Sequence, residues 1–165
     1  MSIAVGLLVI VVAAVAQVSV LPAFSIFGAQ PNLLIVLLVA WMTVRGQPET
    51  LLLIPAAGFA QGLLDSQPLG LALLALAPLV LMTEVRELRL VKSDLLPAVV
   101  LTALATLAYE GIVLLTLAVT GARLDWLASL VDVLVPAVIA NVLLLLPVYG
   151  LVQLASLDLR RRQAF

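Results

Sequence analysis

The sequence predicts an all-α integral membrane protein, a bundle of about six transmembrane helices. Of its 165 residues, 65% are hydrophobic and 10% are charged, and the mean hydropathy is +1.31, so there is too little polar surface to cover a water-soluble globule. The apolar runs are continuous in Leu, Val and Ala, whereas the strands of a membrane barrel alternate apolar and polar residues. A span needs about 20 residues, so the chain has room for about six spans and no second domain.

Pro, Gly and charged residues mark the boundaries between the expected helices, which together form one transmembrane domain over residues 1–165. The expected spans are residues 3–21, 32–44, 50–64, 69–85, 95–119 and 127–154. The first span is also compatible with a signal peptide, since Ala14-Val15-Ala16 resembles a small-residue cleavage site. No Lys or Arg precedes this run, and signal peptides begin with a basic region, so we expect the first helix to be retained.

The connections between spans contain the remaining polar residues. Gln47-Pro48-Glu49 joins the short second and third spans and predicts a tight turn between a close pair of helices. The fourth span leads into a segment from Arg86 to Asp94 that is expected to lie at the lipid headgroups. Pro136 and Pro147 are expected to bend the sixth helix.

The third span carries two glycines and a carboxylate on one helical face. Gly58 and Gly62 are four residues apart, Asp65 follows three residues later, and Gln61 lies beside this face. The Gly-xxx-Gly spacing allows a second helix to approach at backbone contact distance, either inside the bundle or in a partner. Asp65 fits two roles equally, a cap on the fourth helix or a contact with a partner.

The distribution of basic residues predicts the orientation of the bundle. If both termini are cytoplasmic, seven of the eight basic residues lie inside and only Arg123 lies outside, as the positive-inside pattern requires. The seven are Arg45, Arg86, Arg89, Lys92, Arg160, Arg161 and Arg162. The last three are expected to act as a topology signal and headgroup anchor rather than as a docking site for a cytoplasmic filament.

Glu110 is the clearest ionisable residue inside a span. It lies near the middle of the fifth span, with Thr106 one turn earlier and Tyr109 beside it, while Asn141 occupies the middle of the sixth. One interpretation is a neutral, hydrogen-bonded acid that ties these two helices together. The other is a proton or substrate site, which is disfavoured because no span contains a Lys, Arg or His partner for a relay.

The residue types exclude most catalytic, metal and cofactor sites. The chain has no Cys and no His, which removes thiolate nucleophiles, imidazole bases and the usual zinc and haem ligands, so no cofactor or metal is expected. Its serines are scattered without a base at dyad spacing, and no P-loop is present, so we expect no catalytic site and no enzyme. Eight basic against nine acidic residues give no attraction to nucleic acid.

Seven residues in three neighbouring segments form a set of motifs in a characteristic order. Pro and Asn open the second span, a Gly-Phe-x-x-Gly-x-x-Asp motif closes the third, and a Gly begins the fourth. The residues are Pro31, Asn32, Gly58, Phe59, Gly62, Asp65 and Gly70. This set resembles the motifs of the MreD family of rod shape-determining proteins, most strongly over residues 30–82. The long fourth span with Pro78 departs from the family pattern.

The resemblance implies a function and a set of partners. It implies a non-enzymatic, multi-pass subunit of the cell-elongation complex in the bacterial inner membrane, which binds the single-span protein MreC and helps to regulate lateral peptidoglycan synthesis and rod cell shape. The same complex is expected to contain MreB filaments, the glycosyltransferase RodA and a penicillin-binding transpeptidase. Gly58, Gly62 and their neighbours become candidates for the contact with MreC. The resemblance further implies a fold similar to the S-components of energy-coupling-factor transporters.

That fold similarity supplies an alternative function, a solute- or vitamin-binding membrane subunit of an energy-coupling-factor transporter. Such a subunit needs a water-accessible pocket with converging polar groups. The polar residues available to line one are Gln17, Gln61, Tyr109, Glu110 and Asn141. An intramembrane enzyme ranks third, because the chain offers no nucleophile-base pair and no set of metal ligands.

Overall fold

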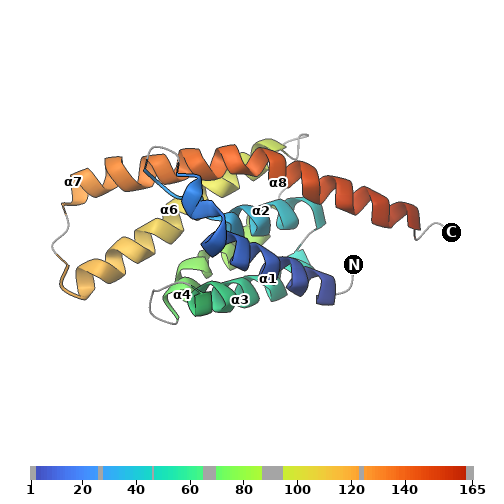
Figure 1. Ribbon diagram of the computed structural model, residues 1–165, viewed down its shortest axis with the longest axis horizontal. Helices are drawn as coiled ribbons and strands as arrows, with labels where there is room; N and C mark the ends of the chain where they lie inside the picture. Colours follow the sequence, from blue (N-terminus) through green and yellow to red (C-terminus); the bar gives the residue numbers. More distant parts are fainter. Residues whose placement is uncertain are drawn as a thin grey trace.

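The computed structural model describes residues 3–25, 28–45, 47–64, 70–86, 95–122 and 125–162, and these are mostly helical (Figure 1). The helices are α1 (Ile3–Ser19), the 3-10 turn η1 (Leu21–Ala23), α2 (Leu33–Arg45), α3 (Gln47–Leu64), α4 (Leu71–Leu76), α5 (Pro78–Arg86), α6 (Leu95–Val119), α7 (Trp126–Ser129), the π-helical η2 (Leu130–Leu134) and α8 (Val135–Arg162). Asp65 and most of the basic segment that follows the fourth span lie outside the described residues.

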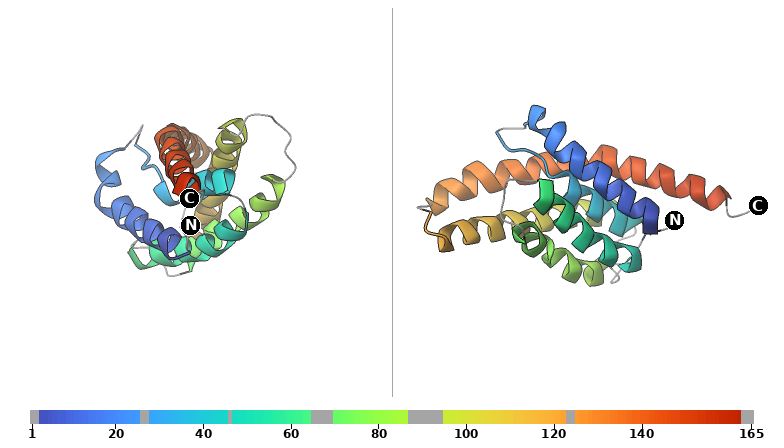
Figure 2. Two further views of the ribbon diagram at one scale, coloured as in Figure 1. Left: turned by 90° about the vertical axis from the view of Figure 1, so that its right-hand side faces the viewer. Right: turned by 60° about the horizontal axis from the view of Figure 1, so that its bottom comes forward.

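α2 is the central helix of the bundle. Every residue from Leu34 to Thr43 is buried, because α2 is apolar on all sides. It packs against α1, α3, α6 and α8, and Figure 2 shows these helices arranged around it. α4 and α5 instead pack against α3 and α6, outside the group of helices that surround α2.

The turn between α2 and α3 is held by three side chains. Trp41 Nε1 donates a hydrogen bond to Glu49 Oε2 at 3.3 Å, and Arg45 Nε lies 3.7 Å from the same oxygen. The guanidinium carbon of Arg45 lies 5.4 Å from the centroid of the Trp41 ring, where a cation is attracted to the ring face. These contacts tie the end of α2 to the first turn of α3.

α3 and α4 lie in close contact at Gly58. A Cβ atom built on Gly58 would lie 2.9 Å from the Cα atom of Leu73, which is backbone. A side chain at this position would therefore force the two helices apart. Gly62, one turn further along α3, is also buried. The Gly58 part of the glycine face is thus occupied by α4 of the same chain.

The fourth span expected over residues 69–85 is not one continuous helix. α4 ends at Leu76 and α5 begins at Pro78, and the Ala77 N–H bonds to the Leu74 carbonyl at 3.2 Å. Pro78 has no N–H, and its ring clashes with the carbonyl four residues earlier, so the α-helical hydrogen bonding is interrupted here. The long fourth span, whose Pro78 departs from the family pattern, is therefore divided into two helices.

Two helices in the described part of the chain are long and apolar enough to cross a membrane, α6 and the segment Leu130–Ser156. They lie side by side in the bundle (Figure 1). The second of them begins with the π-helical turn η2, which ends two residues before Pro136, where the missing N–H removes one α-helical bond. Pro147 lies inside α8, and this helix continues to Arg162 rather than ending near residue 154 as expected.

The outer surface of the bundle is apolar. Leu8 on α1, Leu81 on α5 and Leu151 on α8 are 62%, 72% and 67% exposed, and similar side chains cover the outward faces of the other helices. A surface of this kind is suited to lipid rather than water. Together with the two long apolar helices, it identifies a membrane protein.

Candidate functional site

The site begins at the N-terminus of α2, because a buried helix needs partners for its first N–H groups. Asn32 caps the helix. Its Oδ1 accepts a hydrogen bond from the Ile35 N–H at 3.2 Å, and its carbonyl accepts one from the Val36 N–H at 3.2 Å. Pro31 comes directly before the cap and has no N–H to satisfy. The Pro-Asn pair in the sequence thus starts the central helix.

Asn141 connects this cap to two other helices. Its Oδ1 accepts a hydrogen bond from the Asn32 N–H at 2.6 Å, and its Nδ2 donates one to Thr106 Oγ1 at 2.9 Å. Thr106 in turn donates to the Thr102 carbonyl one turn earlier at 2.8 Å. Asn141 is 1% exposed and Thr106 is 0% exposed. The bonds therefore join α2, α6 and α8 in an interior closed to solvent.

Gln17 attaches α1 to the same helix start. Its Oε1 accepts a hydrogen bond from the Leu33 N–H at 2.6 Å, and its Nε2 donates one to the Pro31 carbonyl at 3.2 Å. The amide thus satisfies one donor and one acceptor of the backbone where the chain enters α2. We define the α2-start network as Gln17, Asn32, Thr106 and Asn141.

A second polar contact links α3 to α6. Gln61 Nε2 donates a hydrogen bond to the Tyr109 hydroxyl oxygen at 2.8 Å, and the two residues are 5% and 4% exposed. Gln61 Oε1 is buried and accepts no hydrogen bond from the described part of the chain. Gln61 therefore keeps one amide atom unused after it has joined the two helices.

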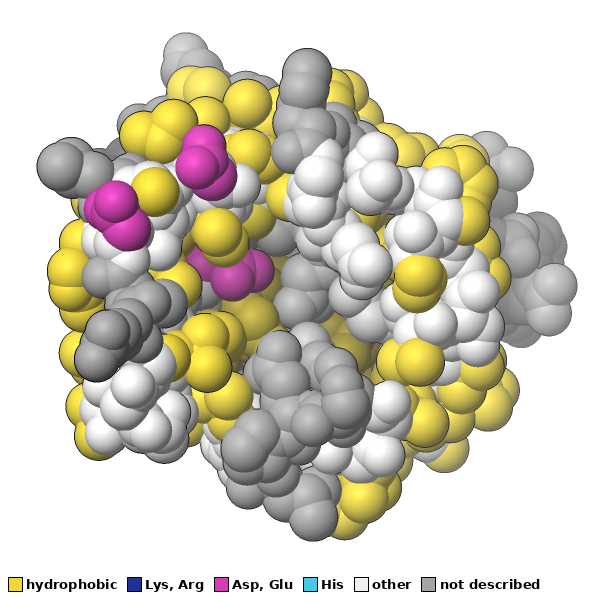
Figure 3. Space-filling model, turned by 60° about the vertical axis from the view of Figure 1, so that its left-hand side comes forward, with side chains coloured by type: hydrophobic (Ala, Val, Ile, Leu, Met, Phe, Trp, Pro, Cys, Tyr) yellow, Lys and Arg dark blue, Asp and Glu magenta, His cyan; other side chains and the backbone are white. Residues whose placement is uncertain are grey.

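Glu110 lies half-buried on α6, one turn beyond Thr106. Within the residues that the structure describes, no hydrogen bond to its side chain is found. The hydrogen bond that ties α6 to α8 comes from Thr106 and Asn141, rather than from the acid that the sequence singled out. Figure 3 shows acidic side chains at the end of the molecule where α6 ends and α7 begins, on one side of a hollow in the surface.

The other predicted site residues lie in different surroundings. Gly58 and Gly62 are on the buried side of α3, whereas Phe59 faces outward and is 57% exposed. Gly70 caps the start of α4 with φ +100°, a conformation that glycine adopts without strain. Asp65 lies outside the described residues. The structure therefore brings Asn32, Asn141 and Gln17 together, but does not bring the motif residues of α3 to them.

Sequence reasoning missed how the polar residues pair. It marked Gln17 only as a residue that lines a chamber, and it did not single out Thr102. The one signal available was the placement of single polar residues inside apolar helices, which indicates a buried hydrogen bond but not its partner. Backbone N–H groups of α2 are the main partners, and a sequence does not reveal which helix start is buried.

The chemistry open to this site is hydrogen bonding between neutral groups. The α2-start network consists of two Asn amides, one Gln amide and one Thr hydroxyl. Across the described residues, no group of three or more His, Cys, Asp or Glu side chains gathers as a metal site would require. The arrangement is suited to holding helices in fixed positions.

Comparison with known proteins places most of the chain in a family. Residues 1–155 of the 165-residue chain match the family of the rod shape-determining protein MreD. No curated protein and no solved structure matches the chain. The match gives no support to the alternative of a solute-binding transporter subunit.

Proposed function

Because the chain belongs to the MreD family of rod shape-determining proteins, we propose that it is a non-enzymatic subunit of the cell-elongation complex in the bacterial inner membrane. In this role it binds MreC and helps to regulate lateral peptidoglycan synthesis. MreB, RodA and a penicillin-binding transpeptidase belong to the same proposed assembly. The family itself is a shape-determining one, so a part in rod shape determination needs no further assumption.

The use of the buried polar groups supports a scaffold. The side chains of Gln17 and Asn141 hydrogen-bond to the backbone at the start of α2, where Asn32 lies. A site for turnover would instead need an activated nucleophile or base aimed at a substrate. A bundle whose polar atoms hold its own helices in place is suited to presenting a rigid outer surface to other membrane proteins.

The outward face of α3 is the part of that surface we propose for MreC. We define the α3 stripe as Leu52, Pro55, Phe59 and Leu63, which follow one another at helical spacing. Phe59 and Leu63 are 57% and 59% exposed. Phe59 belongs to the motif of α3, yet its ring faces away from the bundle. An exposed aromatic ring on an aliphatic surface is a typical anchor for a partner.

The glycines of α3 have a different role in this proposal. Gly58 lies against Leu73 of the same chain, so the contact with a partner helix is assigned to the outward face of α3, about 100° around the helix from Gly58. Gly58 then acts indirectly, because it sets the position of α3 on α4 and hence the direction in which Phe59 points.

Recovery of MreC with tagged variants tests this proposal. We expect Phe59→Ala to reduce the amount of MreC that co-purifies by about tenfold, the loss typical of an interface anchor. Leu151→Ala is the matched control, since Leu151 is an exposed apolar residue of α8 outside the α3 stripe. Both variants should reach the membrane at the level of the unchanged protein. Equal recovery of MreC with both variants would exclude the α3 stripe as the contact.

A further inference from the structure

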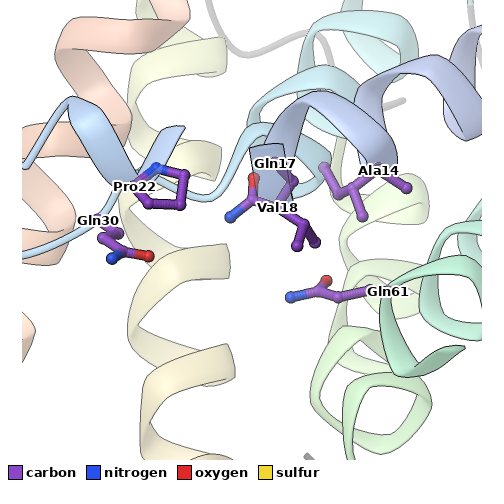
Figure 4. A pocket seen from close by; sticks show the side chains of 7 residues that line it. Ala14, Gln17, Val18, Pro22, Gln30 and Gln61 are labelled. Atoms are coloured by element: carbon purple, nitrogen blue, oxygen red, sulfur yellow. The ribbon is translucent and has the colours of Figure 1, made fainter. Parts of the chain in front are cut away.

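A cavity of about 200 Å³ lies between the end of α1, the segment before α2, the first turn of α2, and α3. Its inner wall is formed by Ala14, Leu34 and Gln61, which are buried, and its mouth by Val18 and Gln30, which are exposed. Figure 4 shows Gln17 and Gln61 extending from α1 and α3 toward the same space. The cavity therefore opens at the surface beside the α2-start network and ends at Gln61.

Gln61 gives the inner end of the cavity an unused hydrogen-bonding atom. Its Nε2 donates to the Tyr109 hydroxyl at 2.8 Å, and its Oε1 is buried without a donor from the described residues. A buried acceptor that loses its water without gaining a partner destabilises the fold. Native structures rarely keep such an atom without a reason. A bound group that donates a hydrogen bond to Gln61 would remove this cost.

The rest of the lining restricts the kind of group that fits. Gln17 uses its Oε1 and one N–H at the start of α2, and an amide nitrogen carries two N–H groups, so one donor remains. Every described residue of the lining is neutral. An ionised ligand would lose its hydration here without meeting an opposite charge. The lining therefore favours an uncharged group that both donates and accepts hydrogen bonds.

We propose that this cavity binds an uncharged, hydroxyl-bearing group. A hydroxyl donates to an amide oxygen and accepts from an amide N–H, so a polyol satisfies Gln61 and Gln17 together. The cavity has room for about seven water molecules at ~30 Å³ each, which suits a three-carbon polyol or a single sugar ring. Such a group has two sources, the glycerol headgroup of phosphatidylglycerol in the membrane or a free polyol in solution. The proposal does not depend on the contact with MreC.

Binding to the purified full-length chain tests the proposal. The chain is placed in phosphatidylcholine nanodiscs. One arm adds phosphatidylglycerol and measures the lipid retained by native mass spectrometry. The other adds glycerol or glucose and measures the shift in the unfolding temperature. Retention of phosphatidylglycerol identifies the lipid source, and a saturable shift with the polyol identifies the soluble source. If phosphatidylglycerol is retained no better than phosphatidylcholine, and neither glycerol nor glucose gives a saturable shift in the unfolding temperature, the proposal is wrong.

Two variants locate the binding. Gln61→Leu removes the amide and should weaken binding by about tenfold, the effect of one buried hydrogen bond. Val18→Trp fills the mouth with a bulky side chain, leaves the amides in place, and should abolish binding even if Gln61→Leu fails to fold. Gln153→Leu, a change at an exposed Gln on α8, is the control and should bind as the unchanged chain does. Unchanged binding by Val18→Trp would overturn the assignment.

Discussion

Asn141 uses both ends of one amide to connect three helices. Its oxygen satisfies the N–H of the cap residue Asn32, and its nitrogen bonds to Thr106. Because Asn141 is 1% exposed, water cannot replace either bond. The residue therefore determines where the start of α2 lies relative to α6 and α8.

Replacement of Asn141 tests this role. Asn141→Leu has a similar size but leaves the Asn32 N–H without an acceptor, so we expect a loss of about 1–3 kcal/mol in the free energy of unfolding. The measurement is unfolding in detergent, followed by the loss of helical circular dichroism. Gln153→Leu changes an exposed Gln on the same helix and should leave the unfolding curve in place. Coincident curves for the two variants would show that the α2-start network contributes little.

Only part of this site could be predicted from the sequence. Gln61 and Asn141 stand out because single polar residues in apolar helices are conspicuous, and Asn32 stands out by its place in the motifs that resemble the MreD family. Their partners do not stand out, since Asn141 and Gln17 bond to backbone N–H groups, which every residue but Pro has. Glu110 drew attention by its charge, but the structure places the α6–α8 hydrogen bond at Thr106.

At the scale of the helices, the close packing of α3 against α4 requires a glycine at residue 58. The Cα atom of Leu73 lies 2.9 Å from where a Cβ of residue 58 would be. The Gly-xxx-Gly spacing indicated a close approach from the sequence but left open which helix approaches. The structure places α4 at Gly58. The exposed Phe59, the next residue, shows that the outward face of α3 adjoins the face with Gly58.

Two Gly→Ala changes should have opposite effects. Gly58→Ala forces the backbone of α4 to move and should destabilise the bundle by about 1–3 kcal/mol, as overpacking does. Gly150→Ala lies inside α8, where nothing would lie within 4 Å of the new methyl group. It should stabilise by about 0.5–1 kcal/mol, because Ala is the better helix former. The same unfolding measurement compares them. Stabilisation by both changes would mean that α3 and α4 do not pack this closely.

Proline explains where helices could and could not be predicted. The turn between α2 and α3 and the ends of α6 follow from Pro, Gly and charge. The break at Ala77 was missed, because residues 69–85 are apolar on both sides of Pro78 and looked like one helix. The central place of α2 could not be foreseen either. Its neighbours are nearly as apolar, so periodicity does not show which helix is enclosed.

At the scale of the whole molecule, the start of α1 and the end of α8 lie at the same end of the bundle (Figure 1). The exposed acids Asp125 and Asp132 lie where α7 and η2 begin the last helix, at the end seen in Figure 3. We propose that the end with the two termini faces the cytoplasm, because basic residues concentrate in the segments connected to it.

Labelling of single cysteines tests this orientation. The chain has no Cys, so one introduced thiol is unique. With a membrane-impermeant maleimide on spheroplasts, Ala122→Cys should react, because Ala122 is exposed just beyond the end of α6. Gln163→Cys should react only after the membrane is permeabilised. The reverse result would invert the orientation.

The central claim is that this bundle is the MreC-binding subunit of the rod complex. The most direct measurement is purification of the tagged, unchanged protein from its native membrane, with quantification of every protein that remains bound. We predict MreC in near-equal molar amount. Absence of MreC, with a transporter ATPase module recovered in its place, would contradict the claim.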